Sequence, residues 1–340
     1  MSEGETPRPP RRQRYPGKNP RRFEDKYKEL DPAAHSETVA KVLASGKTPA
    51  GSHVPIMVDE CLSALDLNPG SRGIDCTLGY GGHALAILEK IQPGGMLWGL
   101  DQDAIELPKT EARIRRAGFG EDEFIAVRSN FAGMPKVLRA QSIDGVDFVF
   151  ADLGCSSMQY DDPSRGFSFK HQGPLDMRMN PTRGLTAADL IKKLEPKELE
   201  EILRENSDEP QAGRIAAALA GRSFATTLEL VTAIRLVADI DPENLVLKRV
   251  FQAIRIEVND EFGALAAFLK TVPSCLKPGG RVAILTFHSG EDRRVKKSFQ
   301  AGMRDGVYAA MSEGVITAGS AERRANPRST AAKLRWAVKV

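Results

Sequence analysis

The chain has 340 residues and a formal net charge of +3 at pH 7, with 41% hydrophobic and 27% charged residues. This length allows two domains or one large domain with an insertion, and the composition is that of an ordinary globular protein. The apolar runs fall short of the roughly 18–20 residues that a membrane-spanning helix needs, and the N-terminus lacks the apolar segment of a secretory signal, so we expect a cytoplasmic protein without membrane contact.

The first segment, residues 1–22, is rich in arginine and proline. Such a segment cannot bury enough apolar surface to fold by itself, so it predicts a mobile basic arm. A phosphate-binding arm and a solubilising tail fit its composition equally well. We expect residues 1–50 to form a flexible basic extension, with weak helical character from 36 to 50.

Strands and helices alternate in the next part of the chain, as judged by their apolar periodicity. This order predicts a parallel, doubly wound α/β sheet with acidic residues at the strand ends. The expected helices are Val58–Leu67, Ala84–Ile91 and about 103–117, and the expected strands are Gly73–Thr77, Met96–Leu100, Glu123–Val127 and Val146–Ala151.

Strand character then disappears, and the stretch 163–250 is expected to be helical. Its helix-start signals are capping boxes at Thr186/Asp189 and Thr226/Glu229 and first-turn prolines at Pro196, Pro210 and Pro242. One long helix is expected over 251–272, followed by a turn at 276–280 and strands Arg281–Phe287 and Lys333–Val340. We therefore expect one α/β domain, 51–162 with 251–340, that carries a helical insertion, 163–250.

Cysteines and histidines give no sign of a disulfide framework or a metal site. The chain has four cysteines and five histidines, all far apart, and no CxxC pair. This pattern is typical of reduced thiols in a cytosolic protein. We expect no bound metal.

A glycine-rich turn, Gly79-Tyr80-Gly81-Gly82-His83, joins the first predicted strand to its helix. Glycines at this place let backbone N–H groups approach a ligand closely. Asp101 ends the second strand, about twenty residues on, where a carboxylate can accept the ribose hydroxyls that NAD and S-adenosylmethionine share. A tight turn with a solvated aspartate is the simpler alternative.

The fourth strand favours S-adenosylmethionine over NAD. It ends in Asp152-Leu153-Gly154-Cys155-Ser156-Ser157, at the place where amino-methyltransferases hold the target amine with a short acidic or asparagine motif. The glycine turn also lacks the G-x-G-x-x-G spacing that suits a pyrophosphate. Together the three motifs predict an S-adenosylmethionine-dependent methyltransferase.

Further motifs make the chain resemble the RsmH (MraW) family of 16S rRNA cytidine N4-methyltransferases over about residues 53–340. Besides the turn and Asp152–Gln159, the resemblance rests on the motifs His53–Met57, Arg165–Phe169, Gly173–Met179, Phe251–Asn259, Phe287–Ser289, Asn326–Arg328 and Ala332–Arg335. It implies a Rossmann-like class I methyltransferase sheet with an inserted all-helical domain. It also implies a cytidine at the decoding centre of the small ribosomal subunit as substrate, and it leaves a homodimer open.

The resemblance implies cofactor contacts, all of which match the family motif: Gly81, Gly82, His83, Asp101, Phe131, Asp152 and Gln159. Phe131 could instead be a core phenylalanine, and His83 a residue of the helix cap. The chain departs from the family at Gly290, where leucine is usual, and in a longer segment at 241–248. The stretch between Phe299 and Asn326 is shorter than usual.

Three residues are candidates for the catalytic step. Asp152 lies at the strand end, and Asp176 is a second candidate base that could equally pair with Arg178 or Arg165. His288 could contact the base or simply support its neighbours. The helical insertion, with Arg165, Lys170 and Arg178 at its start, is expected to hold the RNA.

Three other functions stay open at this stage. A DNA cytosine-N4 methyltransferase would share the turn but usually shows Pro-Pro after the strand-end acid, where this chain has Leu153-Gly154. An NAD-dependent oxidoreductase would need a pyrophosphate turn. A non-catalytic ribosome-assembly factor would bind small subunits and leave them unmethylated.

Overall fold

The computed structural model describes residues 55–340, and the side chain of Ser157 is left out of the description. By its internal contacts the chain divides at residue 52, and everything below concerns the unit that begins at His53. The predictions for the basic arm, for the stretch 36–50 and for His53–Val54 lie outside the described residues.

A seven-stranded sheet has the order β3-β2-β1-β4-β5-β7-β6. Strands β1 to β5 run parallel, and β7 pairs antiparallel with both β5 and β6. All six predicted strands are present, and the short edge strand β6 was not predicted. The strands are β1 Arg72–Asp75, β2 Met96–Asp101, β3 Phe124–Arg128, β4 Val146–Asp152, β5 Leu276–Thr286, β6 Tyr308–Met311 and β7 Lys333–Lys339.

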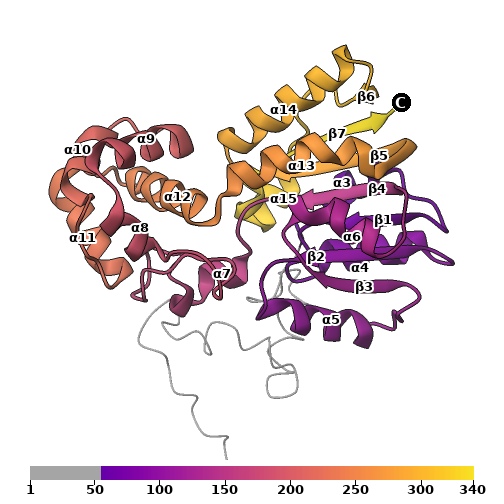
Figure 1. The fold of residues 1–340 in the computed structure, drawn as a ribbon, viewed down its shortest axis with the longest axis horizontal. Helices are drawn as coiled ribbons and strands as arrows, with labels where there is room; N and C mark the ends of the chain where they lie inside the picture. The colour runs from indigo at the N-terminus through magenta and orange to yellow at the C-terminus, as the bar shows by residue number, and fades with distance from the viewer. Residues whose placement is uncertain (1–54) are drawn as a thin grey trace, which may run out of the picture. The chain divides into compact units, whose positions relative to one another are not determined.

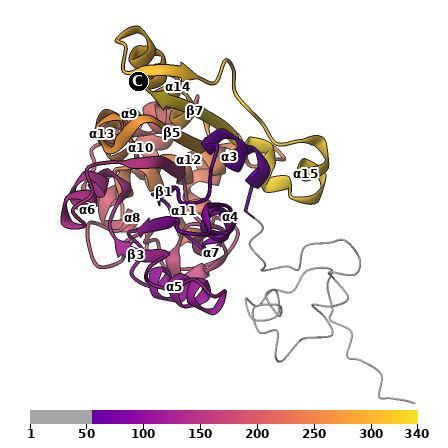
Figure 2. The ribbon, with the colours of Figure 1, turned by 90° about the vertical axis from the view of Figure 1, so that its right-hand side faces the viewer.

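Helices cover both faces of this sheet, so the predicted doubly wound α/β class is confirmed (Figures 1 and 2). One face carries α6, α13 and α14, and the other carries α3, α4 and α5. These helices are α3 Val58–Leu65, α4 Gly82–Ile91, α5 Glu106–Arg116, α6 Met134–Ala140, α13 Glu261–Cys275 and α14 Ser289–Arg304.

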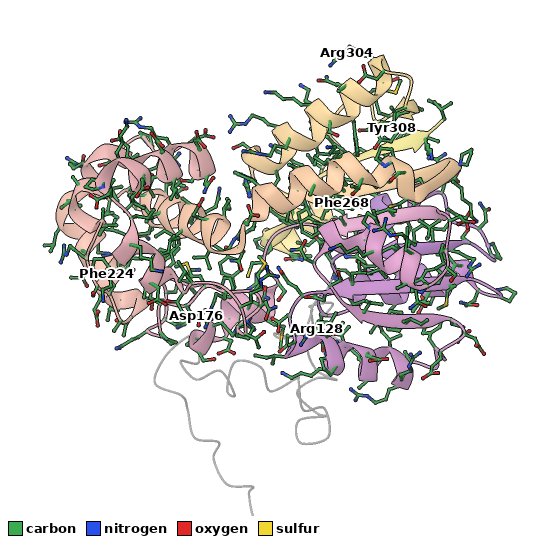
Figure 3. The ribbon with its side chains drawn as sticks, in the orientation of Figure 1. Arg128, Asp176, Phe224, Phe268, Arg304 and Tyr308 are labelled. Carbon is green, nitrogen blue, oxygen red and sulfur yellow. The ribbon has the colours of Figure 1, made fainter. Side chains whose placement is uncertain are left out.

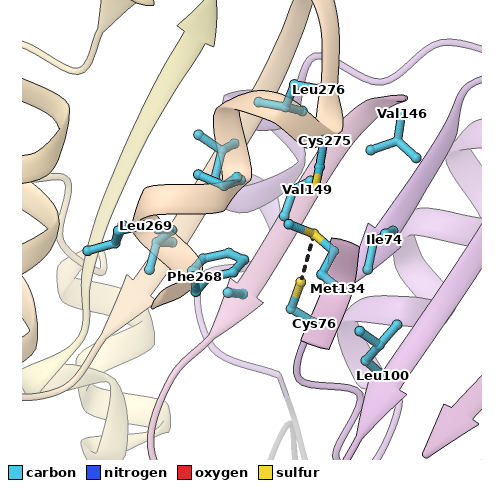
Figure 4. Packing of buried hydrophobic residues seen from close by; sticks show 14 of the residues in the cluster. Ile74, Cys76, Leu100, Met134, Val146, Val149, Phe268, Leu269, Cys275 and Leu276 are labelled. Atoms are coloured by element: carbon cyan, nitrogen blue, oxygen red, sulfur yellow. Dashed lines mark hydrogen bonds between the residues drawn. The ribbon is translucent and has the colours of Figure 1, made fainter. Parts of the chain in front are cut away.

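The first face is closed by aliphatic, aromatic and sulfur-containing side chains. Phe268 of α13 points toward the strands that carry Val149 and Ile74, and Leu269 belongs to the same buried cluster (Figure 4). The buried Cys76 thiol lies 3.8 Å from the sulfur of Met134. All four cysteines are free thiols, as the sequence predicts.

A second core belongs to the helices that follow the fourth strand, which lie together at one end of the described chain (Figure 1). Phe224, labelled in Figure 3, is one of its buried members. The elements of this helical layer are α7 Ser157–Asp161, the 3-10 turn η3 Pro163–Arg165, α8 Ala187–Lys193, α9 Pro196–Ser207, α10 Ala212–Leu219, α11 Thr227–Val237 and α12 Leu245–Asn259.

The helix-start signals are confirmed in part. The hydroxyl oxygens of Thr186 and Thr226 accept from the backbone N–H groups three residues on, and Pro196 occupies the first turn of α9. The Glu229 carboxylate, however, caps the N–H of Ala225. Pro210 and Pro242 are wrong as first-turn residues, because α10 begins at Ala212 and α12 at Leu245.

The expectation of a helical stretch fails over residues 166–186, which contain no regular element except an isolated bridge from Pro174 to Thr226. Glycines and prolines interrupt any helix here. A Cβ at Gly166, whose φ is +72°, would lie 2.1 Å from the carbonyl oxygen of Pro174. The close approach of the backbone at 166 to the backbone at Pro174 therefore requires glycine at this position.

The single helix expected over 251–272 is wrong, since it is two helices that meet at Asp260. Asp260 has a left-handed φ of +47°, so α12 ends there and α13 begins at Glu261. Phe251 and Ile254 of α12 lie in the core of the helical layer. That layer consequently extends past residue 250.

The remaining elements, α15 Ser320–Ala325 and the 3-10 turn η4 Pro327–Ala331, lead into β7, and the 3-10 turn η2 Phe131–Gly133 precedes α6. Among the helices of residues 55–340, none combines the length and the apolar character needed to cross a bilayer.

Candidate active site

Three aspartates lie at the carboxyl ends of neighbouring strands: Asp75 of β1, Asp101 of β2 and Asp152 of β4. The strand order reverses between the parallel neighbours β1 and β4, because β2 and β3 lie to one side of β1, and β4 and β5 lie to the other. Ligands of doubly wound sheets bind in the crevice outside the strand ends at such a switch point. The sequence-predicted carboxylates therefore lie where a ligand site is expected.

The glycine turn between β1 and α4 is held in one conformation by contacts with α5. Gly81 has a φ of +83°, and a Cβ there would lie 2.8 Å from the Cγ2 of Thr110. The Thr110 hydroxyl donates to the carbonyl of Gly79 over 2.6 Å. The Arg113 guanidinium stacks 3.4 Å from the centre of the Tyr80 ring and donates to the Tyr80 carbonyl. Helix α5 thus fixes the turn, and the amino end of α4 presents backbone donors to a ligand.

Asp101 is bound to this turn through its carboxylate. Oδ2 accepts from the N–H of Gly79 and Oδ1 from the N–H of Asp103, each over 2.8 Å. Burial raises the pKa of Asp101 above its usual value. Each oxygen keeps a second lone pair, so the group can still accept hydroxyl donors.

Asp152 has a carboxyl group that the described residues leave partly unsatisfied. Oδ1 is buried and accepts no hydrogen bond from any described residue, and Oδ2 lies 3.6 Å from Nδ1 of His83. The side chain is still 29% exposed, so the group is open to a ligand. Burial, and then the negative charge of Glu291, raise the pKa of Asp152 to about 7.

Glu291 was missed by the sequence reasoning, although it stands three residues after the predicted His288. Its Oε2 accepts from the N–H of Phe287 over 2.9 Å, and its Oε1 lies 3.3 Å from Nε2 of His288. Although burial opposes it, the contact with His288 holds the pKa of Glu291 below its usual value. An ionised glutamate therefore faces Asp152 from the start of α14.

Gly290, the departure from the family pattern, is explained by its neighbour Phe262. A Cβ at 290 would lie 2.7 Å from the Cζ of Phe262 and 3.1 Å from the Nδ1 of His288. The Arg294 guanidinium stacks 3.4 Å from the centre of the same phenylalanine ring. A leucine could fit here only if Phe262 moved.

Gln159 belongs to a buried polar network that centres on Asp103, a residue the sequence reasoning did not select. Asp103 Oδ2 accepts from Nε2 of Gln159 and from Nη1 of Arg165, both over 2.9 Å. The Oε1 atom of Gln159 accepts from the Ser156 N–H and the Cys155 thiol. This network joins the loop after β2 to the beginning of the helical layer.

Two other predicted residues have simpler surroundings. Phe131 packs edge-on against Phe268 with ring centres 5.5 Å apart, and it remains partly exposed. Asp176 is paired with Arg178, which donates to both of its oxygens over 2.8 and 2.7 Å. Although burial opposes it, this pairing keeps the pKa of Asp176 below its usual value. The ion pair considered as its alternative is the arrangement observed.

The predicted residues thus fall into two groups. His83 and Asp152 are in direct contact, and His288 lies beside Glu291, the carboxylate that faces Asp152. Asp101 binds the glycine turn next to them. Asp176, by contrast, is tied to Arg178 in the loop of the helical layer (Figure 3).

The chain is similar in sequence to known proteins over most of its length. The chain matches the MraW methylase family over residues 50–340. Proteins named ribosomal RNA small subunit methyltransferase H 1 of Agathobacter rectalis and H 2 of Alkaliphilus metalliredigens are 46% and 45% identical to it, and each match covers 97% of both chains. A solved structure, a putative rRNA-methylase from Clostridium thermocellum, is 11% identical with a TM-score of 0.42, over 83% of this chain and 95% of that one.

The strand order with its antiparallel β7, the helices on both faces and the turn after β1 make up the Rossmann-like arrangement of class I methyltransferases. The family match includes every described element of that arrangement and of the helical layer. The chain belongs to the MraW methylase family.

Proposed function

We propose that this protein transfers the methyl group of S-adenosylmethionine to the N4 amine of a cytidine in 16S rRNA, at the decoding centre of the small ribosomal subunit. Its membership of a methylase family and the relatives named ribosomal RNA small subunit methyltransferase H support methylation of ribosomal RNA. S-adenosylmethionine is the cofactor. The N4 position and the decoding centre come from the resemblance to the RsmH family.

The residues around the turn fit this cofactor. The backbone at Gly81 and Gly82 leaves no room for side chains, since a Cβ at Gly82 would lie 2.9 Å from the Pro55 ring. Asp101 would accept the ribose hydroxyls. Phe131, which keeps part of its ring exposed, would pack on the adenine.

Gln159 has few hydrogen-bonding groups left for a ligand. Its carbonyl oxygen already accepts two hydrogen bonds, and its amide nitrogen donates to Asp103. One amide hydrogen remains for a ligand. We propose that Gln159 acts mainly by fixing the loop that follows Asp152.

The single observation that carries the proposal is the unsatisfied carboxyl oxygen of Asp152 at the end of β4. The N4 lone pair of cytidine is delocalised into the base and is a poor nucleophile. An oxygen that accepts an N4 hydrogen localises this lone pair and afterwards takes the proton. Asp152 can do both, because its pKa of about 7 keeps it partly ionised at neutral pH and makes it a better base than an exposed aspartate.

Positioning of the amine against the methyl group would supply much of the remaining rate enhancement. The bound cofactor offers an electrophilic methyl group, and the amine must approach it to about 3–3.5 Å in line with the leaving sulfur. Two neighbours influence Asp152: Nδ1 of His83 lies 3.6 Å from its Oδ2, and the negative charge of Glu291 raises its pKa. Asp176, whose oxygens are both bound by Arg178, is the weaker candidate base.

We propose that the helical layer and its irregular loop, 166–186, hold the RNA while the cytidine leaves its stack. The basic residues predicted for this role differ in their availability. Arg165 is buried on Asp103, and Arg178 is paired with Asp176, whereas Lys170 is exposed. Substitution of Lys170 should therefore weaken RNA binding without loss of stability.

The test offers labelled S-adenosylmethionine with three acceptors: small subunits that lack the modification, protein-free 16S rRNA and double-stranded DNA. We expect label in RNA of the small subunits and none in DNA. Preferential labelling of DNA would support the cytosine-N4 DNA methyltransferase alternative and contradict the proposal. Binding to small subunits without label would indicate an assembly factor.

A further inference from the structure

His83 occupies a position between a backbone carbonyl and the proposed base. Its Nε2 lies 2.9 Å from the carbonyl oxygen of Ile56, and its Nδ1 lies 3.6 Å from Oδ2 of Asp152. The ring is held against Phe150, with centres 4.8 Å apart. The Ile56 carbonyl and the Phe150 ring thus fix the direction in which each ring nitrogen faces.

The Ile56 carbonyl determines the tautomer of the neutral ring. A carbonyl can only accept, so Nε2 must carry the hydrogen and donate it to Ile56. Nδ1 is then a free lone pair, and it faces the carboxyl group of Asp152. Two acceptors at this distance repel each other unless a proton lies between them.

We propose that His83 is a positioning residue for methyl transfer, whose Nδ1 holds the proton that Asp152 removes from the substrate amine. The inference rests on the proposed function for the source of that proton. The family resemblance assigns His83 only to cofactor binding, and the side-chain role described here is separate from it.

The amine nitrogen forms a bond to the methyl carbon as the carbon–sulfur bond breaks, and the sulfonium becomes a neutral thioether. The nitrogen, now cationic, gives one proton to the ionised Asp152. That proton then lies in a hydrogen bond from Asp152 to Nδ1 or moves onto Nδ1 to form an imidazolium, and it returns to solvent when the product leaves.

Several titratable groups face this pair and influence its proton affinity. Glu291 of α14 faces Asp152, and Asp75 of β1 faces both members of the pair. Cys61 of α3 and Glu322 of α15 complete the surroundings. Burial lowers the pKa of His83, so the ring is neutral before the reaction, as an acceptor must be.

The first experiment needs no substrate. The chain has five histidines, so ¹⁵N-histidine spectra of the whole protein are simple, and the His83→Gln variant assigns the His83 signals. We expect an unprotonated Nδ1 and a protonated Nε2 at pH 8. On acidification the Nδ1 signal should move with the proton shared by the pair, and Asp152→Ala should shift that transition by at least about one pH unit. A protonated Nδ1 at pH 8, or a titration unaffected by Asp152→Ala, would overturn the inference.

The second experiment compares two amide variants in single-turnover methylation of small subunits at saturating cofactor. His83→Gln can still donate to Ile56 but places no acceptor at Nδ1, whereas His83→Asn places its amide near Nδ1 and loses Ile56. We expect His83→Gln to lose about 10- to 100-fold in rate, with cofactor affinity retained, and His83→Asn to recover part of it. In His83→Gln the protonated form of Asp152 has lost its acceptor, so the pKa of Asp152 should fall. The acid limb of the pH profile of this variant should therefore move to lower pH.

The outcomes separate the two proposals. A loss that is equal at every pH, or one explained by weaker cofactor binding, would make His83 a structural or cofactor residue and contradict the inference. If the wild-type protein methylates no cytidine N4, the proposed function fails, while the histidine spectra still decide whether His83 and Asp152 share a proton.

Discussion

Arg165 donates to Asp103 over 2.9 Å, and the two side chains are only 10% and 2% exposed. This buried pair connects the loop after β2 to the start of the helical layer. Arg165→Met would leave the Asp103 charge in place without its cation, so we predict a loss of about 3 kcal/mol in unfolding free energy, measured by urea denaturation. Arg204→Met removes the exposed pair with Glu200 and should cost less than about 0.5 kcal/mol. Equal losses in both variants would contradict the role given to Asp103.

A second prediction concerns the glycine turn. Gly81→Ala places a Cβ 2.8 Å from Thr110 at a φ of +83°, whereas Gly118→Ala has a φ of +102° and no atom within 4 Å. The left-handed backbone alone should cost each variant about 1–2 kcal/mol. Only Gly81→Ala should also weaken S-adenosylmethionine binding, by about tenfold or more in calorimetry. Unchanged cofactor affinity in Gly81→Ala would remove the turn from the cofactor site.

Glu291→Gln should change the pH dependence of methyl transfer. The negative Glu291 adds to burial in raising the pKa of Asp152. The neutral amide can still accept from the Phe287 N–H, so the local structure should persist. Without the charge the pKa of Asp152 falls, and the acid limb of the single-turnover rate should move to lower pH. The exposed Glu313→Gln serves as the control, and a limb that stays in place in Glu291→Gln would show that Glu291 does not act on the base.

Asp75 should make stability depend on pH. Burial raises its pKa from 3.8 to about 7. The folded state therefore binds this proton more tightly than the unfolded state does, and its stabilising effect is complete below about pH 3.8 and is lost as the pH rises toward 7. The slope is about 1.4 kcal/mol per pH unit.

Asp75→Asn removes this dependence and can keep the hydrogen bond from the Thr77 N–H. Relative to the wild type, the variant should gain stability steadily between about pH 4 and pH 7 and then level off, as measured by denaturation across that range. A constant difference between the two proteins at all pH values would mean that Asp75 is ionised in the folded state.

Much of the sheet is predictable from sequence because its parallel strands are largely apolar segments, three of which (β1, β2 and β4) end in aspartate. The edge strand β6 is not, since Tyr308–Met311 has four residues and a single pairing partner. The break at Asp260 also escapes prediction, because a non-glycine residue takes a left-handed φ there. In both places tertiary packing outweighs local pattern.

A residue of the site is predictable from sequence only where it belongs to a recognisable motif. Asp101 and Asp152 follow from their positions at strand ends, and the contact between His83 and Asp152 does not, because it depends on how α4 lies against β4. Asp103 looks like a surface residue in sequence, yet it is buried and binds Gln159 and Arg165. Glu291 had a usable signal, an acid three residues after His288 at a helix start.

The central claim is that Asp152 serves the methylation of a cytidine amine, and mapping the methylated nucleoside tests it most directly. Small subunits that lack the modification are incubated with labelled S-adenosylmethionine and either wild-type protein or Asp152→Ala, and the labelled nucleoside is identified by mass spectrometry of digested 16S rRNA. The wild type should yield N4-methylcytidine at one position, and the variant should yield none while it still binds the cofactor. Label on another atom or macromolecule, or wild-type turnover by Asp152→Ala, would contradict the claim.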